Sequence, residues 1–232
     1  MSGRGHRSLG RDLARAQHFL CDPQVARRVV ADSGVGPTDV VIEFGAGSGV
    51  LTEALADQAG TVVAVEIDER YVRVLTRRSR DRRNVIVIAA DAIAFPLPAS
   101  PFRVVANPPF NRTGALLRRL LGDLESGLVR ADLIVQWQVA RARAAADGGP
   151  CDRLGATWGP WWQFRRGRRL PARLFRPQPA VDAAVLIIER RKAPFLPPAE
   201  HEAYAAFLPE DFSPGLPVSE WVRRFGRRPA TA

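Results

Sequence analysis

Short apolar runs alternate with longer amphipathic segments along most of this 232-residue chain. Each run is nearly continuous and rich in valine and isoleucine, which is typical of parallel strands that are buried on both faces. The amphipathic segments between them are long enough for the helices that connect such strands. Strands are expected at residues 39–44, 61–67, 84–89, 102–106 and 132–137.

The last third of the chain continues this pattern and then changes. Residues 180–190 are expected to form a further strand, paired with residues 157–164. The whole pattern predicts an α/β fold, a Rossmann-like, doubly wound domain with a mostly parallel seven-stranded sheet. We expect this domain to span residues 16–190, between a flexible basic arm at 1–15 and a proline-rich linker with a small helical region at 191–232.

A glycine-rich turn follows the first predicted strand. Gly45, Gly47 and Gly49 stand between a strand and a helix, where glycine lets the backbone turn sharply and approach a ligand closely. The spacing lacks the third glycine of the dinucleotide fingerprint. It fits S-adenosylmethionine better than NAD, because S-adenosylmethionine has no pyrophosphate to bind. A glycine-rich turn alone remains a weak signal.

Acidic residues close the first three strands in order, at Glu43, Glu66 and Asp91. A carboxylate in the position of Glu66 can accept hydrogen bonds from both ribose hydroxyls of a nucleoside cofactor. Asp91 can accept one from an adenine amino group. Each acid alone is more simply explained as a solvated strand end. Together with the glycine turn, they predict a class I S-adenosylmethionine-dependent methyltransferase.

The fourth strand ends in the tetrapeptide 107–110, Asn-Pro-Pro-Phe, at the edge of the sheet where the cofactor is expected. The exocyclic amine of a base is a poor nucleophile, because its lone pair is conjugated with the ring. The amide oxygen of Asn107 and the main-chain carbonyl of Pro108 can accept its two hydrogens and orient the nitrogen. Phe110 offers a face on which an extruded base can stack. A strand stop with a core phenylalanine is the simpler alternative.

The chain carries a formal net charge of +10, almost all of it from arginine. A bias towards arginine codons replaces lysine but does not create an excess of positive charge. Arginine suits phosphate because its planar fork binds two oxygens, so a nucleic acid partner is expected. Residues 164–177 hold six arginines and no acid, which fits an RNA backbone groove, although a solvated loop is the alternative. The expected RNA-binding residues are Arg112, Arg165, Arg166, Arg168, Arg169, Arg173, Phe175 and Arg176.

Four segments together resemble one family. They are AQHFL (16–20), EFGAGSGVLTEAL (43–55), NPPF (107–110) and LFRPQPAVDAAVLIIERR (174–191). In this order they resemble the Erm methyltransferases, the macrolide-resistance relatives of the KsgA-type ribosomal RNA adenine dimethyltransferases. The resemblance implies transfer of one or two methyl groups to N6 of a single adenine in the peptidyl-transferase loop of 23S rRNA. That methylation blocks the binding of macrolides, lincosamides and streptogramin B.

The resemblance also implies roles for individual residues. Asn107, Pro108 and Phe110 would be catalytic, with Phe175 as a second wall of the base pocket. Pro108 replaces the family's usual aliphatic residue, and fewer residues follow the catalytic domain than a helical C-terminal domain needs. The residues implied to contact S-adenosylmethionine are Gln17, His18, Leu20, Glu43, Gly45, Ala46, Gly47, Glu66, Ile67, Asp91, Ala92 and Asn107.

Three other functions remain open: a KsgA-like 16S rRNA dimethyltransferase, a DNA adenine methyltransferase, and a non-catalytic rRNA-binding assembly factor. The chain leaves little room for a DNA target-recognition domain. Cys21 and Cys151 give neither a metal-ligand spacing nor a disulfide framework. No apolar run reaches the roughly 18 to 20 residues that span a bilayer, and the N-terminus lacks the features of a secretory signal. We expect a cytoplasmic monomer whose partner is naked or not yet assembled 23S rRNA.

Overall fold

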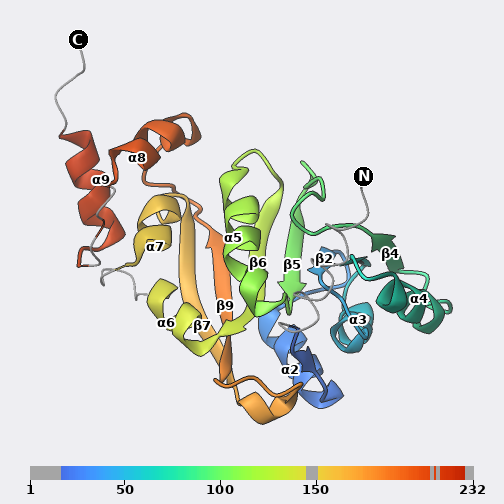
Figure 1. The fold of residues 1–232 in the computed structure, drawn as a ribbon. Helices are drawn as coiled ribbons and strands as arrows, with labels where there is room; N and C mark the ends of the chain where they lie inside the picture. The colour runs from blue at the N-terminus through green and yellow to red at the C-terminus, as the bar shows by residue number, and fades with distance from the viewer. Residues whose placement is uncertain (1–16, 145–150, 210–211, 213–214, 228–232) are drawn as a thin grey trace, which may run out of the picture.

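The computed structural model of the chain describes residues 17–144, 151–209, 212 and 215–227. Its centre is a seven-stranded sheet with the strand order β4-β3-β2-β5-β6-β9-β7, which confirms the predicted fold class (Figure 1). The strands from β4 to β6 run parallel, whereas β9 is antiparallel to both β6 and β7. The basic arm predicted at 1–15 lies outside the described residues. The strands are β2 (Val40–Phe44), β3 (Thr61–Glu66), β4 (Val85–Ala89), β5 (Phe102–Ala106), β6 (Leu128–Gln136), β7 (Trp162–Leu170) and β9 (Ala183–Arg190).

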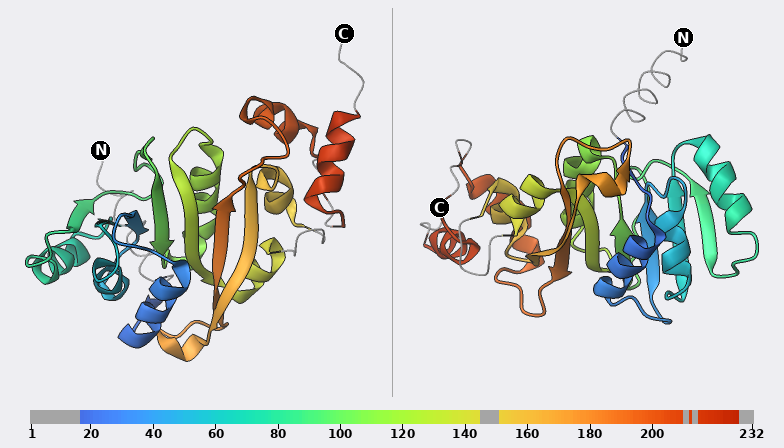
Figure 2. Two further views of the ribbon diagram at one scale, coloured as in Figure 1. Left: turned by 180° about the vertical axis from the view of Figure 1, so that it is seen from behind. Right: turned by 90° about the horizontal axis from the view of Figure 1, so that it is seen from below.

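Helices cover both faces of this sheet (Figure 2). Neighbouring residues of a strand point to opposite faces. Val41 and Val105 therefore pack with α2 and α3, whereas Ile42 and Val104 pack with α5. Since both faces of the central strands are buried, most of their residues are apolar, which explains the nearly continuous apolar runs. These helices are α2 (Pro23–Ser33), α3 (Val50–Ala56), α4 (Glu69–Arg78) and α5 (Thr113–Gly122).

The segment before β7 differs from its prediction. Residues 157–164 were expected to be a strand, but Trp158 ends helix α7 (Arg153–Trp158) and β7 begins only at Trp162. The side chain of Asp152 accepts a hydrogen bond from the backbone N–H of Gly155 at 2.8 Å and so caps α7. The helix start lies in the segment CDRLG, whereas the three tryptophans that follow it favour a strand.

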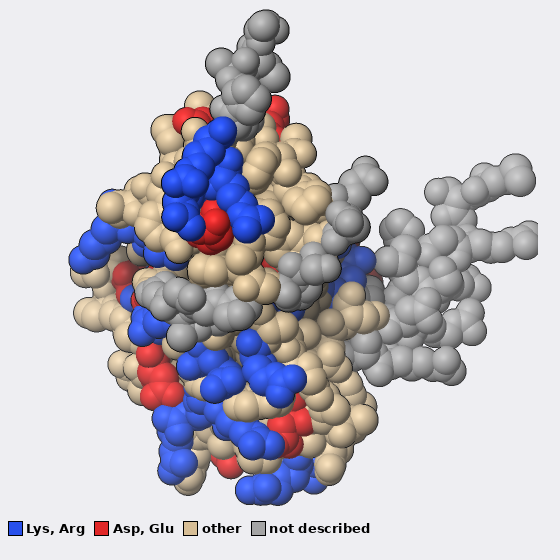
Figure 3. Space-filling view, turned by 90° about the vertical axis from the view of Figure 1, so that its left-hand side faces the viewer, with Lys and Arg blue, Asp and Glu red and all other residues tan. Residues whose placement is uncertain are grey.

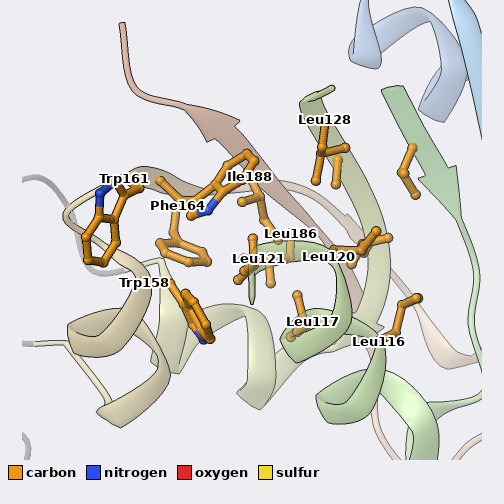
Figure 4. Packing of buried hydrophobic residues seen from close by; sticks show 14 of the residues in the cluster. Leu116, Leu117, Leu120, Leu121, Leu128, Trp158, Trp161, Phe164, Leu186 and Ile188 are labelled. Carbon is orange, nitrogen blue, oxygen red and sulfur yellow. The ribbon is translucent and has the colours of Figure 1, made fainter. Parts of the chain in front are cut away.

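The tryptophans of this region belong to the core. Trp158, Trp161 and Trp162 expose 9%, 2% and 0% of their surface. Figure 4 shows Trp158 and Trp161 beside Phe164, in the cluster that also holds the leucines of α5. Their burial makes them unavailable for stacking on a base.

The C-terminal helices α8 (His201–Phe207) and α9 (Val218–Gly226) pack at the β7 end of the molecule (Figure 1). Tyr204 and Phe225 are buried in the same cluster as Trp161. The Tyr204 hydroxyl donates a hydrogen bond to the carbonyl of Ala156 in α7. The boundary predicted at residue 190 therefore marks a change in amino-acid composition, because buried side chains on its two sides share one core. Within the described ranges, no helix has the length and apolar character that crossing a bilayer requires.

Candidate active site

A cleft of about 480 Å³, its open mouth included, lies where the carboxyl ends of β2, β3, β4 and β5 meet. The predicted site residues that line it are Gln17, Gly45, Glu66, Ile67, Asp91, Ala92, Pro108 and Arg112. The rest of its lining is Phe44, Val65, Ala90, Ile93, Pro109 and Leu116. The predicted site residues His18, Leu20, Glu43, Ala46, Gly47, Asn107 and Phe110 are not part of this lining.

The Glu66 carboxylate joins the glycine turn to the end of β3. One of its oxygens accepts the backbone N–H of Gly47 at 2.9 Å, and the other accepts those of Ile67 and Asp68 at 2.8 and 2.9 Å. Burial raises the pKa of Glu66, and these three donors oppose that effect. The neighbouring Ile67 side chain stays 46% exposed at the cleft, where it can cover the face of a flat ring.

Glu43 lies behind the glycine turn rather than in the cleft. The hydroxyl of Thr52 in α3 donates a hydrogen bond to its carboxyl at 2.6 Å. Burial raises the pKa of Glu43 to about 8, and the nearby Glu66 acts in the same direction. The side chain therefore ties α3 to β2. The expected contact of Glu43 with the cofactor stays a prediction.

Position 47 requires glycine for two reasons, its backbone conformation and its contact with another residue. Its φ of +54° lies in the left-handed region, and a Cβ atom there would come within 2.6 Å of the Phe19 ring. Phe19 also contacts the Tyr71 ring, with centroids 5.0 Å apart. The aromatic residue of the QHFL segment thus covers the glycine turn. The motif itself was the signal, but its partner was not predictable from sequence.

Asp91 has an unexpected partner. A terminal nitrogen of Arg112 lies 3.1 Å from each oxygen of the Asp91 carboxylate, and the backbone N–H of Ile93 donates to the same carboxylate. Arg112 was expected to bind RNA. The structure instead pairs it with Asp91 inside the cleft, because the short helix η1 (Phe110–Arg112) turns it towards β4. The expected RNA contact of Arg112 stays a prediction.

The first and last family-like segments pair with each other. Strand β1 (Phe19–Leu20) is antiparallel to β8 (Phe175–Arg176), and the backbone N–H of Cys21 donates to the carbonyl of Leu174. The His18 Nδ1 lies 2.7 Å from the carbonyl oxygen of Pro177, and since a carbonyl only accepts, Nδ1 is the donor. Two segments separated by most of the chain are thereby fixed beside the cleft.

Asn107 is oriented by this paired segment. Its amide nitrogen donates to the His18 carbonyl at 2.8 Å. Because that carbonyl cannot donate, the assignment of nitrogen and oxygen in the amide is unambiguous. The remaining oxygen, Oδ1, is buried and has no hydrogen-bond partner among the residues that the structure describes. A buried, unpaired acceptor costs free energy, so it marks a position where a donor is expected to bind.

The carbonyls of the two prolines that follow Asn107 differ in their hydrogen bonding. The Pro109 carbonyl accepts the backbone N–H of Arg112 at 2.8 Å. Among the described residues, no hydrogen bond uses the carbonyl of Pro108. The Phe110 ring lies with its centroid 5.2 Å from that of His18. Asn107 and Pro108 can therefore present two acceptors beside an aromatic ring, which is what positioning an exocyclic amine requires.

Phe175 lies in the core and not on the surface where an RNA-binding residue was expected. Its side chain is completely buried, and it meets Phe110 edge-on, with centroids 6.4 Å apart. It packs in the cluster of α2 and α3, beneath the pairing of β1 with β8. Phe175 thus supports Phe110 from within the core. Neither a direct RNA contact nor an exposed wall of a base pocket agrees with this position.

The predicted RNA-binding arginines on β7 are all exposed, and β7 is an edge strand of the sheet. Figure 3 shows the end of the molecule to which β7 belongs, with Lys and Arg side chains gathered over its lower half. Arg173 and Arg176 are exposed too, and Arg176 donates to the carbonyl of Phe175. Within the described residues, no three His, Cys, Asp or Glu side chains are grouped so that they could hold a metal ion.

Comparisons with known proteins agree on one family. The family described as ribosomal RNA adenine dimethylase matches residues 13–213. The chain is 35% identical to an rRNA adenine N-6-methyltransferase of Corynebacterium diphtheriae, over 97% of this chain and 86% of that protein. It is 36% identical to the mycinamicin-resistance protein MyrB of Micromonospora griseorubida, over 90% and 70%. The crystal structure of the 23S rRNA methyltransferase ErmE superposes with a TM-score of 0.73 at 31% identity, covering 81% of this chain and 76% of that one.

Proposed function

Since this chain belongs to the ribosomal RNA adenine dimethylase family, we propose that it transfers methyl groups from S-adenosylmethionine to N6 of one adenine in 23S rRNA. The observation that carries the proposal is the buried, unpaired Oδ1 of Asn107 beside Phe110. This oxygen is a hydrogen-bond acceptor at the edge of the sheet where the cleft opens. The amino group of an adenine can donate the hydrogen bond that this oxygen lacks.

The cleft supports the choice of cofactor. Glu66 has its carboxylate at the end of β3, where it can accept from ribose hydroxyls in addition to the backbone donors. Asp91 offers acceptors for an adenine amino group, and the half-exposed Ile67 covers the ring. S-adenosylmethionine, when bound, supplies an electrophilic methyl group. The residues of the protein hold the cofactor and orient the nitrogen that accepts the methyl group.

The chemistry of the acceptor fits Asn107 and Pro108. Asn107 Oδ1 accepts one hydrogen of the adenine amine, and the Pro108 carbonyl accepts the other. With both hydrogens held, the nitrogen lone pair is less conjugated with the ring and points away from the two acceptors. Phe110 stacks on the extruded base and fixes its plane. Catalysis then depends on positioning, with no strong general base.

The choice of 23S rRNA rests on the named relatives. ErmE is described as a 23S rRNA methyltransferase and MyrB as a mycinamicin-resistance protein. We therefore infer that methylation by this chain protects ribosomes from macrolides, lincosamides and streptogramin B, and that it takes place in the cytoplasm, with its substrate. The proline at position 108 keeps the carbonyl that the mechanism needs, so the NPPF tetrapeptide does not by itself favour DNA.

One experiment separates the candidate substrates. The purified chain is incubated with radiolabelled S-adenosylmethionine and with protein-free 23S rRNA, 16S rRNA or duplex DNA, and the labelled base is mapped. We expect label at N6 of one adenine of 23S rRNA. Label confined to 16S rRNA would support the KsgA-like alternative, and label confined to DNA the DNA methyltransferase. Cofactor binding without transfer to any of the three would favour the non-catalytic assembly factor.

A further inference from the structure

The four arginines of β7 divide into two pairs with different surroundings. Arg168 makes two hydrogen bonds to the Asp32 carboxylate of α2, at 2.7 and 3.0 Å, and Arg165 pairs with Glu189 of β9. The other two arginines instead lie over an indole ring. The register between β7 and β9 shifts between Arg166 and Arg169, which allows both of them to reach the same ring.

That ring is Trp137, the first residue of α6 (Trp137–Arg143). The guanidinium carbons of Arg166 and Arg169 lie 4.6 and 4.9 Å from its centroid. A guanidinium that stacks by its face keeps its in-plane N–H donors free for other partners. The indole therefore fixes two cationic groups without using up their N–H donors, and of the two only Arg169 donates to a carboxylate among the described residues, that of Asp182.

The position of Trp137 relates it to the active site. It directly follows β6, which is parallel to β5, so it lies at the same edge of the sheet as Asn107. The Trp137 backbone N–H donates to the carbonyl of Asp182. The Asp182 carboxylate accepts from Arg169 and from the backbone N–H of Ala172, which begins the segment that leads to Phe175. Asp182 thus connects the Trp137 indole, the Arg169 guanidinium and the segment that leads to Phe175, which packs against Phe110.

Charge distinguishes Arg166 from the other three arginines. Arg165 and Arg168 each have a carboxylate of their own. On the Trp137 side, Asp182 is the one acid that pairs with either arginine, and no carboxylate of the described residues pairs with Arg166. An exposed guanidinium that is fixed in place and lacks an acid is suited to an external anion.

We propose that Trp137 holds Arg166 and Arg169 as a clamp for the phosphates of the RNA strand beside the target adenine, whereas Arg165 and Arg168 stabilise the fold. This rests on the proposed function, since it takes rRNA as the substrate. It assigns a positioning role to Trp137 and divides a group of arginines that the sequence treats as equivalent.

The test measures binding of the full chain to a fluorescent fragment of the rRNA that it methylates, at several KCl concentrations. Loss of one phosphate contact is expected to weaken binding about tenfold and to reduce the slope of log K against log salt by about one. We expect this for Arg166→Gln. Trp137→Leu should reproduce it, because both guanidiniums lose their platform, and Trp137→Phe should restore most of the affinity because it keeps an aromatic face.

Two further variants serve as controls for lost charge. Arg224 of α9 also lies over a tryptophan, 5.6 Å from the Trp221 centroid, so Arg224→Gln removes a similar pair elsewhere and should keep the wild-type slope. Arg168→Gln should lower the melting temperature and keep the slope. The affinity for S-adenosylmethionine, measured by calorimetry, should stay the same in every variant, which shows that the site is folded.

The outcomes separate the two proposals. If the wild type methylates rRNA but Arg166→Gln and Trp137→Leu keep its affinity and slope, the clamp is wrong and the proposed function stands. If Arg168→Gln or Arg224→Gln lowers the slope as much as Arg166→Gln, the division of the arginines is wrong. If the wild type neither binds nor methylates any rRNA, the proposed function fails and the clamp with it.

Discussion

Asn107 combines two roles in one amide. Its nitrogen is used by the protein, in the bond to the His18 carbonyl, while its oxygen has no partner. The first role fixes the direction of the second. A residue of this kind is sensitive to replacement even where the replacement is small, because loss of either end of the amide removes the oriented acceptor.

We expect Asn107→Ala to lower the rate of methyl transfer by about 10²- to 10³-fold, the usual effect of removing an oriented polar group that acts in the transition state. Since Asn107 does not line the cleft, the affinity for S-adenosylmethionine should change much less. Single-turnover kinetics and calorimetry measure the two effects separately. Asn84→Ala is the matched control, because the Asn84 amide donates to the carbonyls of Ala56 and Ala59 and has no part in the site. A near-normal rate for Asn107→Ala would show that this amide does not position the amine.

The raised pKa of the Glu43 carboxyl predicts how the stability of the protein depends on pH. Its pKa is about 8 in the folded protein and near the ordinary 4.5 in the unfolded chain. Between these values the folded state holds a proton that the unfolded chain has released. The contribution of Glu43 to stability is therefore complete below about pH 4.5 and is lost as the pH rises towards 8, by up to about 1.4 kcal/mol per pH unit.

Glu43→Gln removes this titration and keeps an oxygen that can accept from Thr52. The variant should gain stability relative to the wild type as the pH rises from 5 to 8, by up to a few kcal/mol, with no further gain above pH 8. Urea unfolding at four pH values measures the difference. Two curves that stay parallel over this range would show that Glu43 does not titrate as its burial implies.

At the scale of elements, the glycine turn, α3 and β1 form one unit. Phe19 from β1 covers the turn, and Gly47 has no space for a methyl group beneath the ring. The turn therefore cannot take its conformation independently of the N-terminal segment.

Gly47→Ala and Gly34→Ala separate backbone strain from this contact. Both glycines have a positive φ, of +54° and +66°, but no atom lies within 4 Å of a Cβ at Gly34. Gly34→Ala should cost about 1 to 2 kcal/mol of stability and leave cofactor affinity unchanged. Gly47→Ala should cost more and also weaken binding of S-adenosylmethionine, because Phe19 must move. Equal effects of the two substitutions in denaturation and calorimetry would contradict the contact.

The elements also show how far the sequence could be interpreted. The parallel strands and the order Glu66, Asp91, Asn107 followed from local patterns, because residues buried on both faces must be apolar and strand ends meet at one edge. Helix α7 was missed because its capping residue lies close to a tryptophan-rich stretch. The pairing of Arg112 with Asp91 and the burial of Phe175 depend on contacts between distant segments, which periodicity does not encode.

At the scale of the whole molecule, the C-terminal helices complete the core at the β7 end. Tyr204 is fully buried against α7 and Phe225. We expect Tyr204→Ala to lower the free energy of unfolding by about 3 to 5 kcal/mol through the cavity it leaves. Tyr204→Phe removes only the hydrogen bond to Ala156 and should cost about 1 kcal/mol. Thermal denaturation measures both, and a Tyr204→Ala variant as stable as Tyr204→Phe would show that this end of the core is not closely packed.

The pairing of β1 with β8 has a consequence for synthesis. During translation, the glycine turn and the acids of the cleft leave the ribosome well before residues 175–176, which hold β1 in place. Until those residues emerge, the His18 carbonyl that orients Asn107 has no fixed position. We therefore expect a nascent chain to complete both its glycine turn and its methyl-transfer site only after β8 has emerged. On this basis we expect the chain to be unable to modify ribosomal RNA until most of it has been synthesised.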